Sequence, residues 1–238
     1  MAMHTLINPQ SFHPVLRTTV HHRPPAPADC ALHLLYRLPP LLFVDPYELS
    51  NRAEEYTYAH AGPSNLELPV FALDTTGDAG AGNSSVLLTV EDVEIEIEIE
   101  LPLHVRYAAP SSSSTPLPVI RTELSWPDVF YACSRPNTTA PPPMPANLAS
   151  SLVNKSIHII DAGPHPDAFA VIETPVGNAA DVATVELGTA VVILVSFFYL
   201  LRVFWRTYKR LNAEGRGKLE WCVSNTAQYS VSQETLRN

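Results

Sequence analysis

The chain has 238 residues, enough for one folded domain and a smaller addition. Only 16% of its residues are charged and its net charge is −9, so the composition argues against a nucleic-acid partner bound through a basic surface. The 23 Pro and 9 Gly favour short strands joined by turns over long helices. Three cysteines are too few for a disulfide-dense scaffold or a four-cysteine zinc site.

The first 29 residues hold no apolar run of the length that a signal peptide needs, because polar residues such as His4, His13 and Arg17 divide the apolar ones. We expect residues 1–29 to form a poorly ordered N-terminal extension. Two routes across a membrane stay open for this end of the chain: a start further upstream, or direction by a later apolar span.

Short strand patterns separated by Pro, Gly and Ser follow over residues 30–178. Such spacing predicts a mainly β domain, an antiparallel β-sandwich or a related two-sheet fold. The strand candidates are Ala31–Leu38, Leu66–Leu73, Ser85–Val90, His104–Tyr107, Val119–Glu123, Ser156–Ile160 and Phe169–Glu173.

The clearest strand pattern begins at Val93, where apolar and acidic residues alternate strictly as far as Leu101. A period of two predicts a strand with one buried and one solvated face. The glutamate row (Glu94, Glu96, Glu98, Glu100) is either a cation-binding surface or a solvated face, and we favour the solvated face. Like charges in a row also discourage pairing with another copy at a sheet edge.

Motifs with recognisable chemistry are absent from the sequence. It has no nucleophile elbow, no HExxH and no P-loop. His104 and Arg106 share one face of a short strand and are expected to be structural polar partners. We therefore expect no catalytic residues, no metal site and no cofactor.

An apolar segment from Val182 to Leu201 is long enough to cross a bilayer as a helix. Residues 1–181 hold 8 Lys and Arg against 20 Asp and Glu, whereas residues 182–238 hold 7 against 4. By the positive-inside rule, the N-terminal part is expected to be lumenal and the C-terminal tail cytosolic. The predicted boundaries are 30–178 for the lumenal domain, 182–204 for the transmembrane helix and 205–238 for the tail.

Three N-glycosylation sequons, at Asn83, Asn137 and Asn154, all precede the span, in agreement with this orientation. Cys30 and Cys133 lie on the same, oxidising side. They form either a disulfide or a pair of buried free thiols, because the sequence does not fix their separation.

Three segments resemble the PIG-X family: Leu38–Leu49 (LPPLLFVDPYEL), Pro102–Tyr107 (PLHVRY) and Trp126–Cys133 (WPDVFYAC). The first is the most specific, and the other two support it by order and spacing ahead of a single C-terminal span. The motif residues to which a partner-facing or structural role is assigned are Phe43, Asp45, Pro46, Tyr47, His104, Arg106, Tyr107 and Trp126.

The resemblance implies a non-catalytic, stabilising subunit of GPI mannosyltransferase I in the endoplasmic reticulum membrane. Its implied partner is a multi-span, PIG-M-like catalytic subunit that adds the first mannose to the GPI precursor. The turn at Asp45-Pro46 is either a structural turn anchored by Phe43 and Tyr47 or the partner-facing surface, and Trp126 is either a core aromatic or an interface anchor. The alternative function is a single-pass lumenal cargo receptor or adhesion-like binding protein of the secretory pathway.

Overall fold

The structure is a computed structural model with two compact units, residues Met1–Ala179 and Ala180–Asn238. It describes residues 1–21, 29–63, 65–66, 68–73, 82–91, 96–112, 117–134, 140–163 and 168–234, with side chains as far as residue 212.

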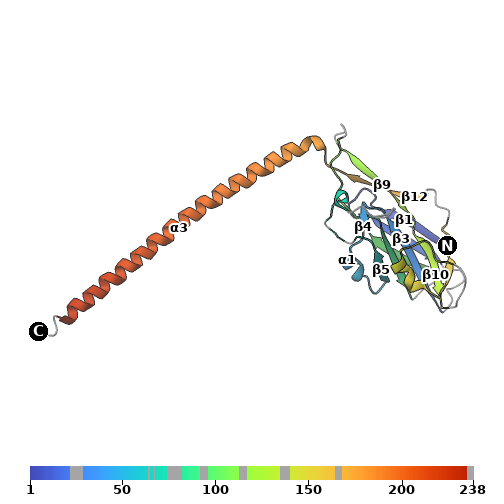
Figure 1. Ribbon diagram of the computed structural model, residues 1–238, viewed down its shortest axis with the longest axis horizontal. Coiled ribbons are helices and arrows are strands. Elements are labelled where there is room, and N and C mark those ends of the chain that lie inside the picture. Colours follow the sequence, from blue (N-terminus) through green and yellow to red (C-terminus); the bar gives the residue numbers. More distant parts are fainter. Residues whose placement is uncertain are drawn as a thin grey trace. The chain divides into compact units, whose positions relative to one another are not determined.

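The first unit is built from antiparallel sheets (Figure 1). A three-stranded sheet has the order β1-β2-β7 and a five-stranded sheet the order β11-β10-β3-β6-β5, with two-stranded pairs β12-β9 and β4-β8 beside them. The strands are β1 Ala2–Ile7, β2 Val15–His21, β3 Cys30–Leu38, β4 Leu42–Phe43, β5 Thr57–Ala61, β6 Ser84–Val90, β7 Glu96–Pro102, β8 His104–Val105, β9 Val119–Ser125, β10 Asp128–Cys133, β11 Ser156–Ile159 and β12 Phe169–Pro175.

The main core lies between the three-stranded and five-stranded sheets. Leu16 and Ile99 contribute from the smaller sheet, and Leu34, Tyr36 and Leu88 from the larger one. This two-layer arrangement confirms the predicted mainly β, sandwich-like class.

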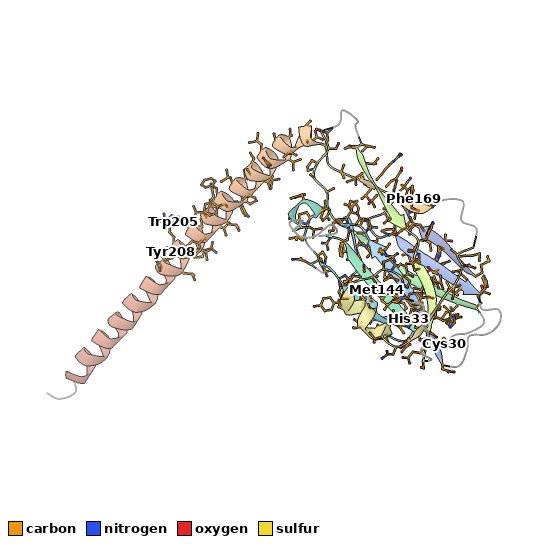
Figure 2. The ribbon with its side chains drawn as sticks, turned by 45° about the vertical axis from the view of Figure 1, so that its right-hand side comes forward. Cys30, His33, Met144, Phe169, Trp205 and Tyr208 are labelled. Atoms are coloured by element: carbon orange, nitrogen blue, oxygen red, sulfur yellow. A yellow bond between two sulfur atoms is a disulfide. The ribbon has the colours of Figure 1, made fainter. Side chains whose placement is uncertain are left out.

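The outer face of the five-stranded sheet is covered by two short helices, α2 Ala146–Ala149 and η2 Ser150–Leu152. Leu148 and Leu152 pack there against Leu35 and Phe130 in a second cluster. Strand β3 is therefore covered on both faces, which accounts for its nearly continuous apolar sequence. Met144 also packs against this cluster and is labelled with His33 in Figure 2.

The N-terminal residues form strands β1 and β2, which corrects the expectation of a poorly ordered extension over residues 1–29. Residues 22–28 lie outside the described part. Buried polar residues hid these strands from sequence reasoning: the His4 Nδ1 and Thr18 Oγ1 atoms lie 3.1 Å apart in the core. The β domain thus includes strand β1 from Ala2 and strand β2 from Val15.

The second unit contains one long helix, α3, from Val182 to Glu234. The stretch Ala179–Asn212, which includes the first part of α3 and the short 3₁₀ helix η3 (Ala179–Asp181) before it, is long and apolar enough to cross a membrane, with a mean hydropathy of 2.2 over the window that defines it. Trp205 and Tyr208 lie on this helix (Figure 2), with the Lys209 ammonium 5.5 Å from the Trp205 ring centroid. The helix begins where the sequence predicted and continues through the segment expected to be a tail.

Candidate functional site

The first of the three resembling segments forms a capped turn. Asp45 lies at the N-cap of α1 (Pro46–Ser50), and its Oδ1 accepts a 2.8 Å hydrogen bond from the Tyr47 backbone N–H. Pro46 occupies the first turn, where it has no N–H to leave unpaired. Phe43 is buried, whereas the Tyr47 side chain is 76% exposed, so of the two aromatic residues expected to anchor this turn only Phe43 is buried.

The second segment meets the first through the pairing of β4 with β8. Phe43 lies opposite His104, and Leu42 opposite Val105. The rings of Phe43 and His104 are stacked with their centroids 5.2 Å apart. Two motifs sixty residues apart in sequence therefore form one structural unit.

His104 joins two partners that sequence reasoning missed. Its Nε2 lies 2.8 Å from Glu48 Oε2, and its Nδ1 lies 2.9 Å from His13 Nδ1. If Nε2–H donates to the carboxylate, a neutral His104 presents an unprotonated Nδ1 that accepts the His13 Nδ1–H. The three side chains then form a chain of hydrogen bonds, Glu48 to His104 to His13.

The Arg106 guanidinium lies over the ring of Phe43. Its guanidinium carbon is 4.4 Å from the Phe43 ring centroid, within cation–π distance. The guanidinium also donates to the carbonyl oxygens of Asn65 and Leu68. Arg106 is almost fully buried, and this burial lowers the pKa of its guanidinium. Arg106 thus holds the loop before η1 (Val70–Ala72) against the two motifs.

We call His13, Phe43, Glu48, His104 and Arg106 the motif cluster. Two aromatic side chains next to it in sequence point to solvent: Tyr47 is 76% exposed and Tyr107 is 72% exposed. The Tyr107 ring centroid lies 5.8 Å from that of Phe12. Phe43 and Arg106 are thus the buried members of the cluster, and Tyr47 and Tyr107 are exposed beside it.

Sequence reasoning could have found Glu48, because it stands three residues after the capping Asp45, the position from which a side chain faces the start of a helix. No sequence signal pointed to His13, which contacts His104 across 91 residues of chain.

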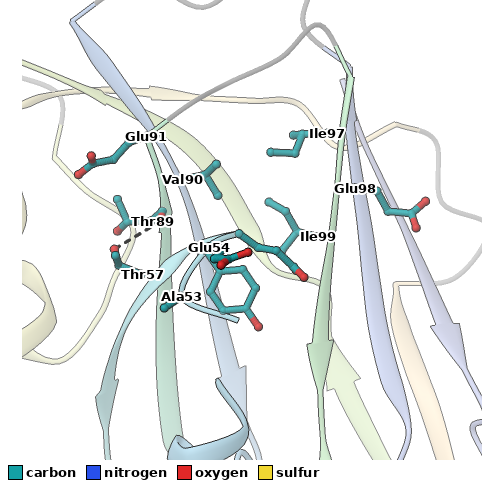
Figure 3. Close-up of a pocket in the computed structure, with 11 residues that line it drawn as sticks. Ala53, Glu54, Thr57, Thr89, Val90, Glu91, Ile97, Glu98 and Ile99 are labelled. Atoms are coloured by element: carbon teal, nitrogen blue, oxygen red, sulfur yellow. Dashed lines mark hydrogen bonds between the residues drawn. The ribbon is translucent and has the colours of Figure 1, made fainter. Parts of the chain in front are cut away.

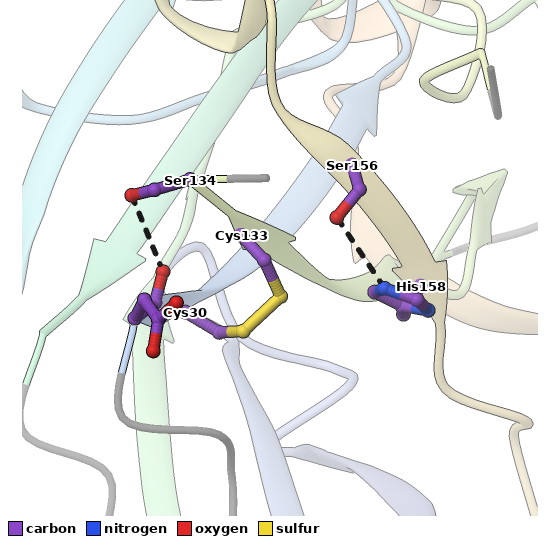
Figure 4. Close-up of a disulfide and its surroundings, with 6 residues drawn as sticks. Cys30, Cys133, Ser134, Ser156 and His158 are labelled. Carbon is purple, nitrogen blue, oxygen red and sulfur yellow. Dashed lines mark hydrogen bonds between the residues drawn. A yellow bond between two sulfur atoms is a disulfide. The ribbon is translucent and has the colours of Figure 1, made fainter. Parts of the chain in front are cut away.

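The third segment, Trp126–Cys133, contacts other residues than those of the motif cluster. Trp126 is partly buried and stacks on His4, with ring centroids 5.7 Å apart. Residues 128–133 form β10, and Cys133 lies opposite Cys30 on β3. The two cysteines form a disulfide, with Cα atoms 4.0 Å apart (Figure 4). Figure 4 also shows Ser134 next to this bridge, where its hydroxyl reaches the Asp29 carbonyl.

Two of the three sequons lie in the described part of the chain. Asn83 and Asn154 are both exposed, and Asn154 has a positive φ of 63°. Asn137 lies outside the described residues, as does Glu94 of the glutamate row.

The other glutamates of that row lie on β7, where they contact basic side chains of the neighbouring β2. Arg17 on the neighbouring β2 contacts Glu98 at 3.2 Å and Glu100 at 2.6 Å. His21 lies 3.6 Å from Glu96. Across the ranges that the structure describes, no group of three or more His, Cys, Asp or Glu side chains is arranged to hold a metal ion.

A family model described as PIG-X / PBN1 matches residues 9–205, which include all three segments and the apolar span. The chain belongs to the PIG-X / PBN1 family. Membership is consistent with an accessory protein related to GPI-anchor biosynthesis.

Curated relatives in this family are named Pbn1. The chain is 26% identical to protein pbn1 of Schizosaccharomyces pombe over 84% of its own length and 58% of the relative's. It is 26% identical to protein PBN1 of Gibberella zeae over 82% of its own length and 41% of the relative's. It is 27% identical to protein pbn1 of Emericella nidulans over 81% of its own length and 41% of the relative's.

The PIG-X / PBN1 chain described here therefore spans about half the length of the curated relatives that it matches. No solved structure matches it.

Proposed function

We propose that this protein is a non-catalytic, stabilising subunit of GPI mannosyltransferase I in the endoplasmic reticulum membrane. In this role the β domain is lumenal, α3 crosses the bilayer once and the C-terminal end is cytosolic. The partner is the multi-span catalytic subunit that adds the first mannose to the GPI-anchor precursor.

The observation that carries the proposal is the convergence of the family-resembling segments. The two segments that contain Phe43 and His104 build one cluster, and the family match extends from the β domain through the span. One family model thus covers both the β domain and the apolar helix. A subunit that docks on a membrane enzyme would use both parts.

The exposed tyrosines beside the motif cluster are the proposed contact with the catalytic subunit. Tyr and other aromatic side chains supply much of the binding energy of protein interfaces, because they bury a large area at little entropic cost. Tyr47 lies in the first turn of α1, one residue before Glu48 of the cluster, and Tyr107 directly follows the buried Arg106, so both side chains are presented beside the cluster. In this proposal Asp45 and Pro46 position Tyr47 and do not contact the partner themselves.

Deletion of the gene followed by re-expression tests the function. We expect deletion to reduce both surface GPI-anchored protein, measured by flow cytometry, and the amount of the catalytic subunit, measured by immunoblotting. Wild-type protein should restore both. Lost anchors with an abundant catalytic subunit would instead indicate a role in catalysis or substrate handling, and unchanged anchors would favour the cargo-receptor alternative.

Co-precipitation tests the proposed surface. The double variant Tyr47→Ala/Tyr107→Ala should accumulate normally yet recover much less catalytic subunit than wild type. Phe169→Ala provides a control, since it removes a partly exposed aromatic side chain from β12, outside the motif cluster. Equal recovery by the double variant and the control would show that the tyrosines are not the contact.

A further inference from the structure

Strand β7 leaves one edge of its sheet open. It is the last strand of the order β1-β2-β7, so among the strands that the structure describes it pairs only with β2. The N–H of Leu103, just beyond β7, bonds to Pro14 next to β2, which places the backbone groups of odd-numbered residues on the β2 side. The Glu100 carbonyl accepts from the Tyr56 hydroxyl, which places even-numbered residues on the other side.

The backbone groups of Glu96 and Glu98 therefore point outward from the sheet. Within the described ranges, neither residue has a backbone partner on that side. Beyond Leu103 the same edge is closed, because β8 pairs there with β4. The open edge is thus a short segment at the start of β7.

A cavity of about 440 Å³ lies next to this edge, between β7 and the strands β5 and β6. Val90 and Ile97 point toward each other across it, and Ile99 lies beside them (Figure 3). The Tyr56 ring also lines it. An extended chain laid along β7 would find an apolar recess for its inward-pointing side chains.

The rim of the cavity is acidic. Glu54, Glu55, Glu91 and Glu98 line it, and among the described lining residues there is no Lys or Arg. Glu55 and Glu98 have arginine partners, whereas no ion pair is formed by Glu54 or Glu91 within the described ranges. Two free carboxylates beside an apolar floor complement a ligand that carries both positive charge and apolar side chains.

We propose that the open edge of β7 binds an extended basic segment of a partner protein by strand addition. Backbone N–H and C=O groups at a sheet edge pair with another peptide, and side-chain pockets then select alternate residues of it. The cavity would take apolar side chains of the segment, and Glu54 and Glu91 would meet its Lys or Arg residues. A second copy of this chain is disfavoured at the edge, because its own β7 would place glutamates against glutamates.

A synthetic peptide that alternates Val and Lys is the probe, added to the full-length protein in detergent micelles. Binding is followed by fluorescence anisotropy, and amide hydrogen exchange gives the position. We expect exchange at Glu96 and Glu98 to slow on binding while that at Ile97 and Ile99 stays unchanged, because the latter amides already bond to β2. A peptide with alternating Val and Glu should not bind, and a Val-Lys peptide with central prolines, which lack N–H donors, should bind at least tenfold more weakly.

Two variants separate charge from backbone pairing. Glu54→Lys/Glu91→Lys should weaken binding at least tenfold, whereas Glu123→Lys, at an exposed position of β9, should not. Glu98→Pro removes an outward N–H while leaving the bonds to β2 intact, and should also weaken binding.

Several results would overturn the proposal. They are no binding of the Val-Lys peptide, unchanged exchange at Glu96 and Glu98, or equal affinity for the charge-reversed protein and the Glu123→Lys control. None of these measurements depends on the catalytic subunit or on GPI-anchor synthesis, so they fail or succeed separately from the proposed function.

Discussion

The guanidinium of Arg106 lies over the ring of Phe43, with 4.4 Å between its central carbon and the ring centroid. The contact joins the two segments that define the motif cluster, and the same guanidinium donates to three carbonyl oxygens, those of Pro63, Asn65 and Leu68. A planar group with several donors suits this task, since one buried side chain satisfies a whole stretch of backbone.

Replacing Arg106 by Ala should destabilise the β domain strongly. The partly buried carbonyls would lose their donor, and Phe43 would lose the buried group that packs on it, at a cost of about 3 kcal/mol. Thermal unfolding of the full-length protein in micelles should then show a Tm roughly 10 °C lower. Arg106→Lys should recover only part of this, because one ammonium cannot reach all three carbonyls with the same geometry.

Arg121→Ala is the matched control. Arg121 is an exposed arginine on β9 that pairs with Glu173 at 2.8 Å, and exposed pairs of this kind contribute about 0–1 kcal/mol. If Arg106→Ala unfolded at the same temperature as Arg121→Ala, the assigned structural role of Arg106 would be wrong.

The bridge between Cys30 and Cys133 should be a second large contribution to stability. It joins residues 103 positions apart, and the chain-entropy model gives about 4–5 kcal/mol for a loop of this length. Cys30→Ser/Cys133→Ser should therefore unfold at a much lower temperature than wild type. Reducing agent should lower the Tm of wild type and leave that of the double variant unchanged.

Cys222→Ser tests the specificity of this effect. The sequence places Cys222 after the span, in the compartment expected to be reducing, so its loss should change neither the Tm nor the response to reductant. Identical mobility of wild type on reducing and non-reducing gels would contradict the intramolecular bridge.

Buried His33 should make the domain less stable at mildly acidic pH. His33 is stacked on Phe130, and desolvation, with a smaller effect of the Lys155 charge, lowers its pKa to about 4. Between about pH 6.5 and pH 4 the unfolded chain binds a proton that the folded chain does not, so the free energy of unfolding falls as the pH falls. The full loss is at most about 3 kcal/mol.

His33→Gln should flatten this part of the pH profile of denaturant unfolding, even if it lowers stability overall. A smaller slope should remain from His60, whose pKa burial also lowers. A profile for His33→Gln parallel to that of wild type would exclude His33 as the source.

Sequence reasoning succeeded where side-chain patterns follow a single period. The alternation that begins at Val93 predicted β7, whose Ile99 and Leu101 are buried while Glu96 and Glu98 are exposed. The mainly β class and the start of α3 at Val182 follow equally from local patterns. At Asp45-Pro46 the sequence predicted a turn, and the structure shows there the capped start of the short helix α1.

Sequence reasoning failed where tertiary contacts replace a local pattern. A strand was predicted over Leu66–Leu73, but Val70–Ala72 form a 3₁₀ helix there. The carbonyls of Asn65 and Leu68 accept hydrogen bonds from Arg106, a side chain about forty residues away. The link between His13 and His104 was equally out of reach, because it depends on the register of β2, β7 and β8.

Glycosylation at Asn154 tests both the orientation and the local backbone. Asn154 is exposed just before β11, with a φ of 63° in the left-handed region that Asn and Gly tolerate best. If the domain is lumenal, endoglycosidase H should increase the gel mobility of the protein. Asn154→Gly should remove one glycan without strain, whereas Asn154→Gln should remove the same glycan and destabilise the domain by about 1 kcal/mol.

Asn83→Gln provides the comparison, because Asn83 is an exposed sequon residue immediately before β6. It should remove one glycan and leave the Tm close to that of wild type. Mobility that no glycosidase changes would contradict the lumenal orientation. Glycans resistant to endoglycosidase H would keep that orientation but place the protein beyond the endoplasmic reticulum, as the cargo-receptor alternative requires.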